Sequence, residues 1–119
     1  MISIKRVYEL PEKKDGKRFL VERLWPRGLR KSDLVMDGWL KEAAPSTKLR
    51  QWFGHDPEKW DEFQARYRKE LEVNQDKWLP TLVEAARQGN ITLLYSAHDT
   101  QHNNALVLKH FMETLVISR

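Results

Sequence analysis

The feature that most constrains the fold is an apolar run at residues 91–97, Ile-Thr-Leu-Leu-Tyr-Ser-Ala, bounded on both sides by polar and turn-forming residues. Its length is that of a strand, and its lack of polar alternation predicts a central strand buried on both faces. Apolar residues at helical spacing predict a helix over 77–88 before it and a helix over about 101–115 after it. This order of elements indicates an α/β domain with a mainly parallel sheet.

Two further strands are predicted near the N-terminus, over residues 2–8 and 18–24. The segment between them, residues 9–17, contains Pro11 and Gly16 and has the composition of a loop. It is too short for a helical crossover, which usually needs about a dozen residues or more. We therefore expect a hairpin between the two strands, the alternative being a loop that replaces a helical crossover.

The middle of the chain contains the start and stop signals of two helices. Ser46 is suited to cap a helix over 47–53, and Gly54 is suited to end it. Asp56-Pro57 then begins a second helix, because Asp is a good N-cap and Pro is tolerated in a first turn. One apolar stripe identifies this helix most securely: Trp60, Phe63, Tyr67 and Leu71.

The boundaries on either side of these helices are less distinct. Asp76 is expected to cap the separate helix over 77–88, with Pro80 in its first turn. Residues 36–44 fit a helix or a strand, and we favour a short strand because Gly38 weakens a helix.

Length, composition and charge limit the fold class, the location and the partners that we expect for this chain. With 119 residues, of which 40% are hydrophobic, the chain fits one three-layer α/β domain over 1–119, with about four strands and helices packed on the sheet's faces. The absence of cysteine excludes disulfides and thiolate metal sites. No apolar run is long enough to span a bilayer and no signal peptide is recognisable, so we expect a cytoplasmic protein with no membrane partner. A net charge of +4 favours an anionic small molecule or a nucleic acid as the partner.

Two arginines and a tryptophan follow the second strand, where ligands bind in open α/β sheets. Arg23 and Arg27 flank Trp25, and Lys41 and Ser46 are expected near the same edge. Because guanidinium groups bind carboxylates and phosphates in two places at once, these residues predict an anion site. The alternative is that Arg27 is a solvated turn residue and that Arg23 pairs with a neighbouring acid.

The segment after the central strand supplies the candidate catalytic groups. His102 is a candidate general base, with Ser96 and Asp99 as candidate partners and Tyr95 as a ligand contact. The alternative is that these residues only cap the next helix. The spacing of His98 and His102 superficially resembles a zinc motif, but His98 falls in a loop, so we expect neither a metal nor a cofactor.

A set of short motifs in a fixed order covers essentially the whole chain: Arg23-Leu24-Trp25-Pro26-Arg27-Gly28, Trp39-Leu40-Lys41-Glu42, Ala44-Pro45-Ser46, Leu49-Arg50-Gln51-Trp52-Phe53, His55-Asp56-Pro57, Leu94-Tyr95-Ser96-Ala97 and His102-Asn103. On these motifs the chain resembles the YeaO-like branch of the family called domain of unknown function 488. The resemblance implies a small, soluble, bacterial α/β domain with no established activity.

The resemblance also directs attention to particular positions. Longer members of the family have an Asp-x-Arg segment where this chain has Glu22 and Arg23, and a Cys-His-Arg segment near His102-Asn103-Asn104. This chain lacks that cysteine and that arginine, so the resemblance does not support a thiol-based mechanism here.

The sequence is consistent with three functions. The first is a small enzyme that acts on a phosphorylated or nucleotide-like ligand, with Arg23 and His102 directed into one hollow above the sheet. The second is a basic nucleic-acid-binding module without catalysis, in which exposed aromatic side chains such as Trp25 stack on bases. The third is a protein-interaction domain, which predicts a large exposed apolar patch and no pocket.

Overall fold

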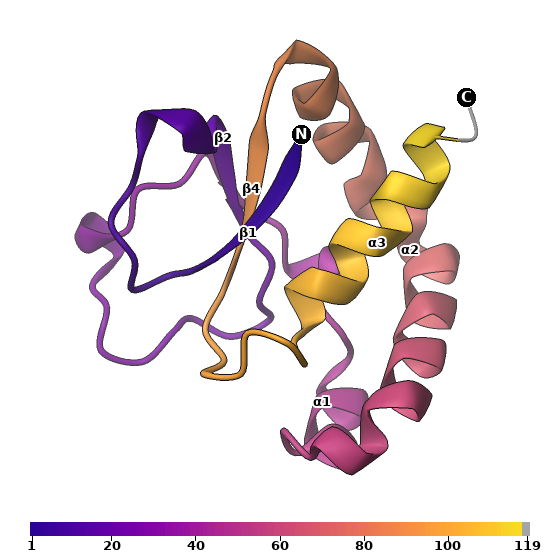
Figure 1. The fold of residues 1–119 in the computed structure, drawn as a ribbon. Helices are drawn as coiled ribbons and strands as arrows, with labels where there is room; N and C mark the ends of the chain where they lie inside the picture. The colour runs from indigo at the N-terminus through magenta and orange to yellow at the C-terminus, as the bar shows by residue number, and fades with distance from the viewer. Residues whose placement is uncertain (118–119) are drawn as a thin grey trace.

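The strand predicted at residues 91–97 is β4 (Ile91–Tyr95), which lies inside a four-stranded sheet (Figure 1). In this computed structural model, which describes residues 1–117, the strand order is β1-β4-β2-β3 and every neighbouring pair is parallel. The other strands are β1 (Ile2–Arg6), β2 (Lys17–Leu20) and β3 (Gly38–Trp39). All five residues of β4 are buried, as the uninterrupted apolar run predicts.

The expected hairpin between the first two strands is wrong. Both β1 and β2 pair in parallel with β4, so that Ile4 and Phe19 lie opposite Leu93 from its two sides. The connection is a loop with one short 3₁₀ turn, η1 (Lys13–Asp15), which takes the place of a helical crossover. A hairpin is excluded because β4, the most apolar strand of the chain, lies between β1 and β2 in the sheet. The short strand favoured within 36–44 is confirmed as β3.

The helix predicted over 47–53 is α1 (Thr47–Phe53). Its N-cap is Ser46, whose hydroxyl oxygen accepts a hydrogen bond from the backbone N–H of Leu49 at 3.2 Å. It ends at Gly54, which has left-handed backbone angles. A 3₁₀ turn, η4 (Pro57–Lys59), then leads into the longest helix, α2 (Trp60–Gln88).

The predicted break at Asp76 is wrong, because α2 continues through it with Pro80 inside the helix. Proline within a helix costs about 3 kcal/mol. The apolar face of α2 carries Trp78 and Leu82 on either side of Pro80, and both side chains are fully buried. This burial holds the two halves in line and outweighs the local preference. No helix within residues 1–117 combines the length and apolar character needed to cross a bilayer.

The last helix, α3 (Asn104–Ile117), begins three residues later than predicted. Asn103 immediately precedes it, and its side-chain oxygen accepts a hydrogen bond from the backbone N–H of Leu106 at 2.9 Å. This is an N-cap interaction, so the chain from 96 to 103 is free to form the edge of a site.

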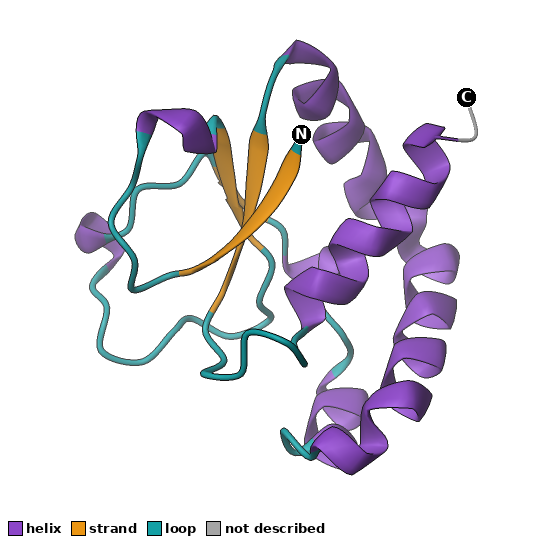
Figure 2. Cartoon of the chain, in the orientation of Figure 1, coloured by secondary structure: helices purple, strands orange, loops and turns teal. Residues whose placement is uncertain are grey.

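The two faces of the sheet are covered differently, as Figure 2 shows. On one face Phe19, Val21, Leu93 and Tyr95 pack with α2 and α3 in the main core. On the other face a smaller cluster around Leu20 and Leu94 is covered by loop residues, including Leu34 next to the turn η2 (Lys31–Asp33). The turn η3 (Lys41–Ala43) instead lies against α2, and its Ala43 belongs to the main core. The predicted α/β class, with a small parallel sheet and packed helices, is confirmed.

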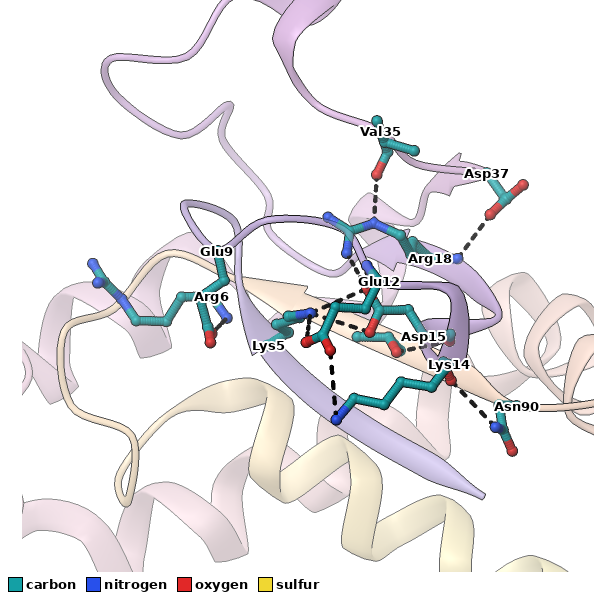
Figure 3. Close-up of polar contacts among 11 residues, drawn as sticks. Lys5, Arg6, Glu9, Glu12, Lys14, Asp15, Arg18, Val35, Asp37 and Asn90 are labelled. Carbon is teal, nitrogen blue, oxygen red and sulfur yellow. Dashed lines mark hydrogen bonds and ion pairs between the residues drawn. The ribbon is translucent and has the colours of Figure 1, made fainter.

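A charged network occupies the loop-covered face near the start of the strands (Figure 3). The carboxylate of Asp15 lies 2.5 Å from Nη1 of Arg18 and 3.2 Å from Nζ of Lys5. Arg18 also donates from Nε to the carbonyl oxygen of Val35 at 2.7 Å. Both Asp15 and Arg18 are about 95% buried, with relative exposures of 5% and 3%. The network joins η1, β1 and β2 and lies at the opposite end of the sheet from the site described next.

Candidate functional site

A cavity of about 80 Å³ opens at the carboxyl ends of β2 and β4. Figure 1 shows α1 and the segment before α3 at this same end of the sheet. The polar lining consists of Glu22, Arg50, His55, Ser96, His102, Asn103 and Asn104. The apolar lining consists of Pro45, Phe53, Phe63 and Ala97. Polar groups from three separate parts of the chain therefore meet where ligands bind in open α/β sheets.

Glu22 is the acidic group of this cavity and follows β2 by two residues. Its Oε1 accepts a hydrogen bond from the backbone N–H of Ser96 at 3.1 Å and another from the Ser96 hydroxyl. Within residues 1–117, no hydrogen bond or ion pair reaches the second oxygen, Oε2. Burial raises the pKa of the Glu22 carboxyl, against the lowering effects of Ser96 and of the charges on Arg50 and His55. A carboxylate in this state is suited to receive an N–H or O–H group from a ligand.

Replacing Glu22 with Gln is expected to raise the melting temperature at neutral pH by a few degrees. The amide oxygen still accepts both bonds from Ser96, while the charge that burial disfavours is removed. Because the folded-state pKa is raised, the wild-type protein loses stability as the pH rises from about 4.5 through that pKa, and the variant does not. Thermal unfolding at several pH values between weakly acidic and neutral measures this difference.

The control for this prediction is Glu72→Gln, which removes the same charge from an exposed position of α2. It is expected to leave the melting temperature nearly unchanged at every pH. A Glu22→Gln protein that melts below the wild type at neutral pH would show that the carboxylate serves the fold rather than a ligand.

His102 is held by Asp99. Its Nδ1 lies 2.8 Å from Oδ2 of Asp99, and because a carboxylate only accepts, this nitrogen carries the proton and leaves Nε2 of the neutral ring as an acceptor. Hydrogen bonds from the backbone N–H of Gln101 and from the His102 ring lower the pKa of the Asp99 carboxyl. Of the predicted trio, Ser96 and His102 line the cavity, and Asp99 contacts His102 without lining it. The Ser96 hydroxyl, however, is bonded to Glu22 rather than to His102.

The opening and one wall of the cavity come from α1 and the start of α2. Phe53 and Phe63 stack with their ring centroids 4.2 Å apart and form an apolar wall. Arg50 and His55 are both exposed at the rim. His55 has a φ of 57° and follows Gly54 with a φ of 53°, so the chain makes a left-handed turn that brings His55 to the rim. A left-handed non-glycine residue costs about 1 kcal/mol or more and is frequent at functional sites.

Four residues predicted to bind an anion lie outside this cavity. Arg23 donates from Nε to the carbonyl oxygen of Pro45 and from Nη2 to that of Ala44, both at 3.1 Å. The expected hollow shared by Arg23 and His102 is therefore not formed, because the guanidinium is engaged with backbone. The other three do not line the cavity: the ring of Trp25 meets that of Trp39, Nζ of Lys41 lies over the Trp39 ring, and Arg27 is exposed.

The two remaining predicted residues have structural contacts. Ser46 caps α1, and its backbone N–H and hydroxyl both donate to the carboxylate of Glu70 on α2, at 2.7 and 2.6 Å. Tyr95 is 2% exposed and belongs to the main core, and burial raises the pKa of its phenol. Neither residue lines the cavity.

The sequence predicted no catalytic or ligand-binding role for Glu22, Arg50 or His55. A signal for Glu22 was its place beside Arg23, in the segment where longer members of the family have Asp-x-Arg. The Gly54-His55 pair, between the end of one helix and the Asp56-Pro57 start of the next, is a signal of a sharp turn. Arg50 carries no such signal, since an arginine in a short helix is most often a solvated residue.

Comparison with known proteins finds a family model and several relatives that match this chain. A family model described as the inactive DUF488-N3 subclade matches residues 1–118. The uncharacterised protein YeaO of Escherichia coli is 43% identical over 114 residues, which is 96% of this chain and 98% of that protein. Uncharacterised proteins of Mycobacterium bovis and Mycobacterium tuberculosis are 49% identical over 70 residues, 59% of each chain. No solved structure matches.

Proposed function

Because the chain belongs to the DUF488 family, in the subclade described as inactive, we propose that it binds a nucleotide-like ligand at the carboxyl ends of its strands and releases it unchanged. The observation that carries the proposal is the free Oε2 oxygen of Glu22 in a cavity whose rim carries the guanidinium of Arg50. Such a site needs a ligand with a hydrogen-bond donor at one end and negative charge at the other.

The chemistry of the cavity supports this assignment. The inner carboxylate accepts an N–H of a base or a hydroxyl of a sugar, and each such charge-assisted bond is worth about 1.5–3 kcal/mol. The stacked rings of Phe53 and Phe63 offer an apolar wall to a planar group. Arg50 and His55 at the rim suit a phosphate. Nucleoside monophosphates carry all three features in this order.

Binding without turnover is favoured by the state of the Ser96 hydroxyl. The Ser96 hydroxyl donates to Glu22 rather than to His102, so the serine–histidine pair of a hydrolase is not formed. The chain also contains no cysteine. The general-base role of His102 stays a prediction, and in this proposal His102 contributes its Nε2 as a hydrogen-bonding group for the ligand.

Isothermal titration with the ribo- and deoxyribonucleoside monophosphates of all bases, inorganic phosphate and amino acids tests the proposal. At least one nucleotide is expected to bind, and Glu22→Gln is expected to weaken that binding by about tenfold or more, or about 1.4 kcal/mol. Arg50→Ala is expected to weaken the same nucleotide and to leave the free nucleoside nearly unaffected. Chromatography of the ligand after incubation should return it unchanged.

The control variant is again Glu72→Gln, which removes an acid from a position outside the cavity. Ligand at ten times its Kd should stabilise the wild type and this control equally, by about 1.4 kcal/mol. No heat from any nucleotide at millimolar concentration, or binding only of amino acids, would contradict the proposal. Conversion of the nucleotide to a product would contradict the part that excludes catalysis.

A further inference from the structure

The excess of positive over negative charge lies in one segment of the chain. Residues 23–50 contain seven Lys or Arg and three Asp or Glu, which accounts for the whole net charge of +4. The rest of the chain is balanced, with equal numbers of basic and acidic residues. Charge that is clustered in this way favours a polyanion more strongly than the same charge spread over the surface.

This segment adjoins the cavity of the proposed function. It forms the loop after β2, then β3, η3 and α1, and it supplies Pro45 and Arg50 to the lining. The indole N–H of Trp39 donates to the backbone carbonyl of Glu22 at 2.6 Å. The ring of Trp25 meets that of Trp39 edge-on, with centroids 5.4 Å apart. Trp39 thus connects Trp25, and Lys41 that lies over its own ring, to the backbone of the residue that carries the free carboxylate oxygen.

Most cations of the segment 23–50 have no acidic partner within the described residues. Within residues 1–117, the side chains of Arg27 and Lys31 make no hydrogen bond or ion pair, and both are exposed. Lys41 is exposed and lies over the ring of Trp39, its Nζ 4.2 Å from the centroid. By contrast, Lys5 and Arg18 each form an ion pair with Asp15. Unmatched, exposed cations are available to phosphates.

We infer that the nucleotide bound in the cavity belongs to a single-stranded nucleic acid, whose neighbouring phosphates bind Arg27, Lys31 and Lys41. This inference rests on the proposed function. A base inside a duplex is paired and stacked, and it would have to leave the stack to reach Glu22. Single strands present unpaired bases, and a half-exposed aromatic side chain beside a cation, such as Trp39 with Lys41, is typical of surfaces that bind them.

Fluorescence anisotropy with labelled single-stranded DNA, single-stranded RNA and duplex DNA, each about 12 nucleotides long, tests the inference. The test variant is Arg27→Ala with Lys31→Ala and Lys41→Ala. The matched control is Arg68→Ala with Lys77→Ala and Arg87→Ala, which removes three exposed cations from α2 and changes the net charge equally. Titration of the nucleoside monophosphate found for the cavity accompanies each measurement.

The test variant is expected to weaken single-strand binding by about tenfold or more and to lower the slope of log affinity against log salt by about 2, since each lost phosphate contact contributes about 0.7. The control should stay within about threefold of the wild type. Both variants should bind the mononucleotide as the wild type does. Tighter binding of RNA than of DNA would assign the 2′-hydroxyl a contact, and equal binding would assign the recognition to base and phosphate.

Several outcomes would overturn the inference, and they are separable from failure of the proposed function. A mononucleotide that binds as tightly as the oligonucleotide would overturn the inference alone. So would equal losses in the test and control variants, duplex bound as tightly as single strands, or oligonucleotide binding that Glu22→Gln leaves unchanged. Absence of mononucleotide binding, by contrast, would remove the proposed function first.

Discussion

Replacement of Asp15 with Ala is expected to destabilise the protein by about 3 kcal/mol and to lower its melting temperature by roughly 10 °C. The change leaves the guanidinium of Arg18 buried without its carboxylate and removes a contact of Lys5 (Figure 3). Breaking a buried ion pair costs about 3–5 kcal/mol, and the lower end applies because a hollow lined by Lys5 and Asp15 brings water close to the pair. Chemical and thermal unfolding measure the effect.

The pH dependence of this loss follows from the direction of the pKa shift. Burial raises the pKa of the Asp15 carboxyl, but hydrogen bonds from the Glu12 backbone N–H and from the side chains of Lys5 and Arg18 outweigh it, so the pKa is lowered. A lowered folded-state pKa adds stability above the ordinary value of 3.8 and loses it as the pH falls through the folded-state pKa. The wild type and Asp15→Ala should therefore converge in stability below about pH 4.

A matched control is present in the same chain. Asp33 pairs with Arg30 at the same three-residue spacing and also accepts a hydrogen bond from a backbone N–H three residues earlier, but this pair is exposed. Asp33→Ala is expected to cost less than about 1 kcal/mol, as for other exposed ion pairs. Equal losses from Asp15→Ala and Asp33→Ala would contradict the role given to the buried network.

Replacement of Gly16 with Ala is expected to cost at least about 3 kcal/mol. Gly16 has φ 64° and ψ −144°, a region that residues with a Cβ rarely occupy. A Cβ added there would also lie 1.9 Å from the backbone oxygen of Asn90. Because the next residue, Lys17, pairs with Ile91, relief of this clash would push β2 away from β4. Urea unfolding gives the loss in stability.

Gly28 separates the two causes of this loss. Its φ is also positive, at 77°, but a Cβ added there would meet no atom within 4 Å. Gly28→Ala is therefore expected to cost only about 1 kcal/mol, the contribution of the backbone conformation alone. A Gly16→Ala protein no less stable than Gly28→Ala would show that β2 and β4 do not approach as closely at this point as the structure has them.

The fold was predictable wherever one local pattern decided it. The unbroken apolar run at 91–97 and the cap and stop at Ser46 and Gly54 gave β4 and α1 correctly. Errors arose where contacts distant in sequence decided the outcome. The insertion of β4 between β1 and β2 leaves no trace in the loop at 9–17. The continuity of α2 through Pro80 depends on the burial of side chains against the sheet and α3.

The location of the candidate site was easier to predict than the residues that line it. The rule that ligands bind beyond the carboxyl ends of the strands led to Ser96 and His102, which line the cavity. Arg23 was a natural choice for an anion because of its charge, but its Nε and Nη2 bind carbonyl groups that only the folded turn at 44–45 brings near. Glu22 was not chosen, because a single acid beside a strand gives no sign of its burial.

Mapping a bound nucleotide by NMR tests directly whether the cavity beside Glu22 is the binding site. Backbone amide signals of ¹⁵N-labelled protein are followed during titration with the nucleoside monophosphate that binds best, in the wild type and in Glu22→Gln. We expect the largest shifts at Glu22, Ser96, His102 and Asn103, and we expect them to be greatly reduced in the variant. Shifts confined to other parts of the surface, or equal shifts in both proteins, would contradict this expectation.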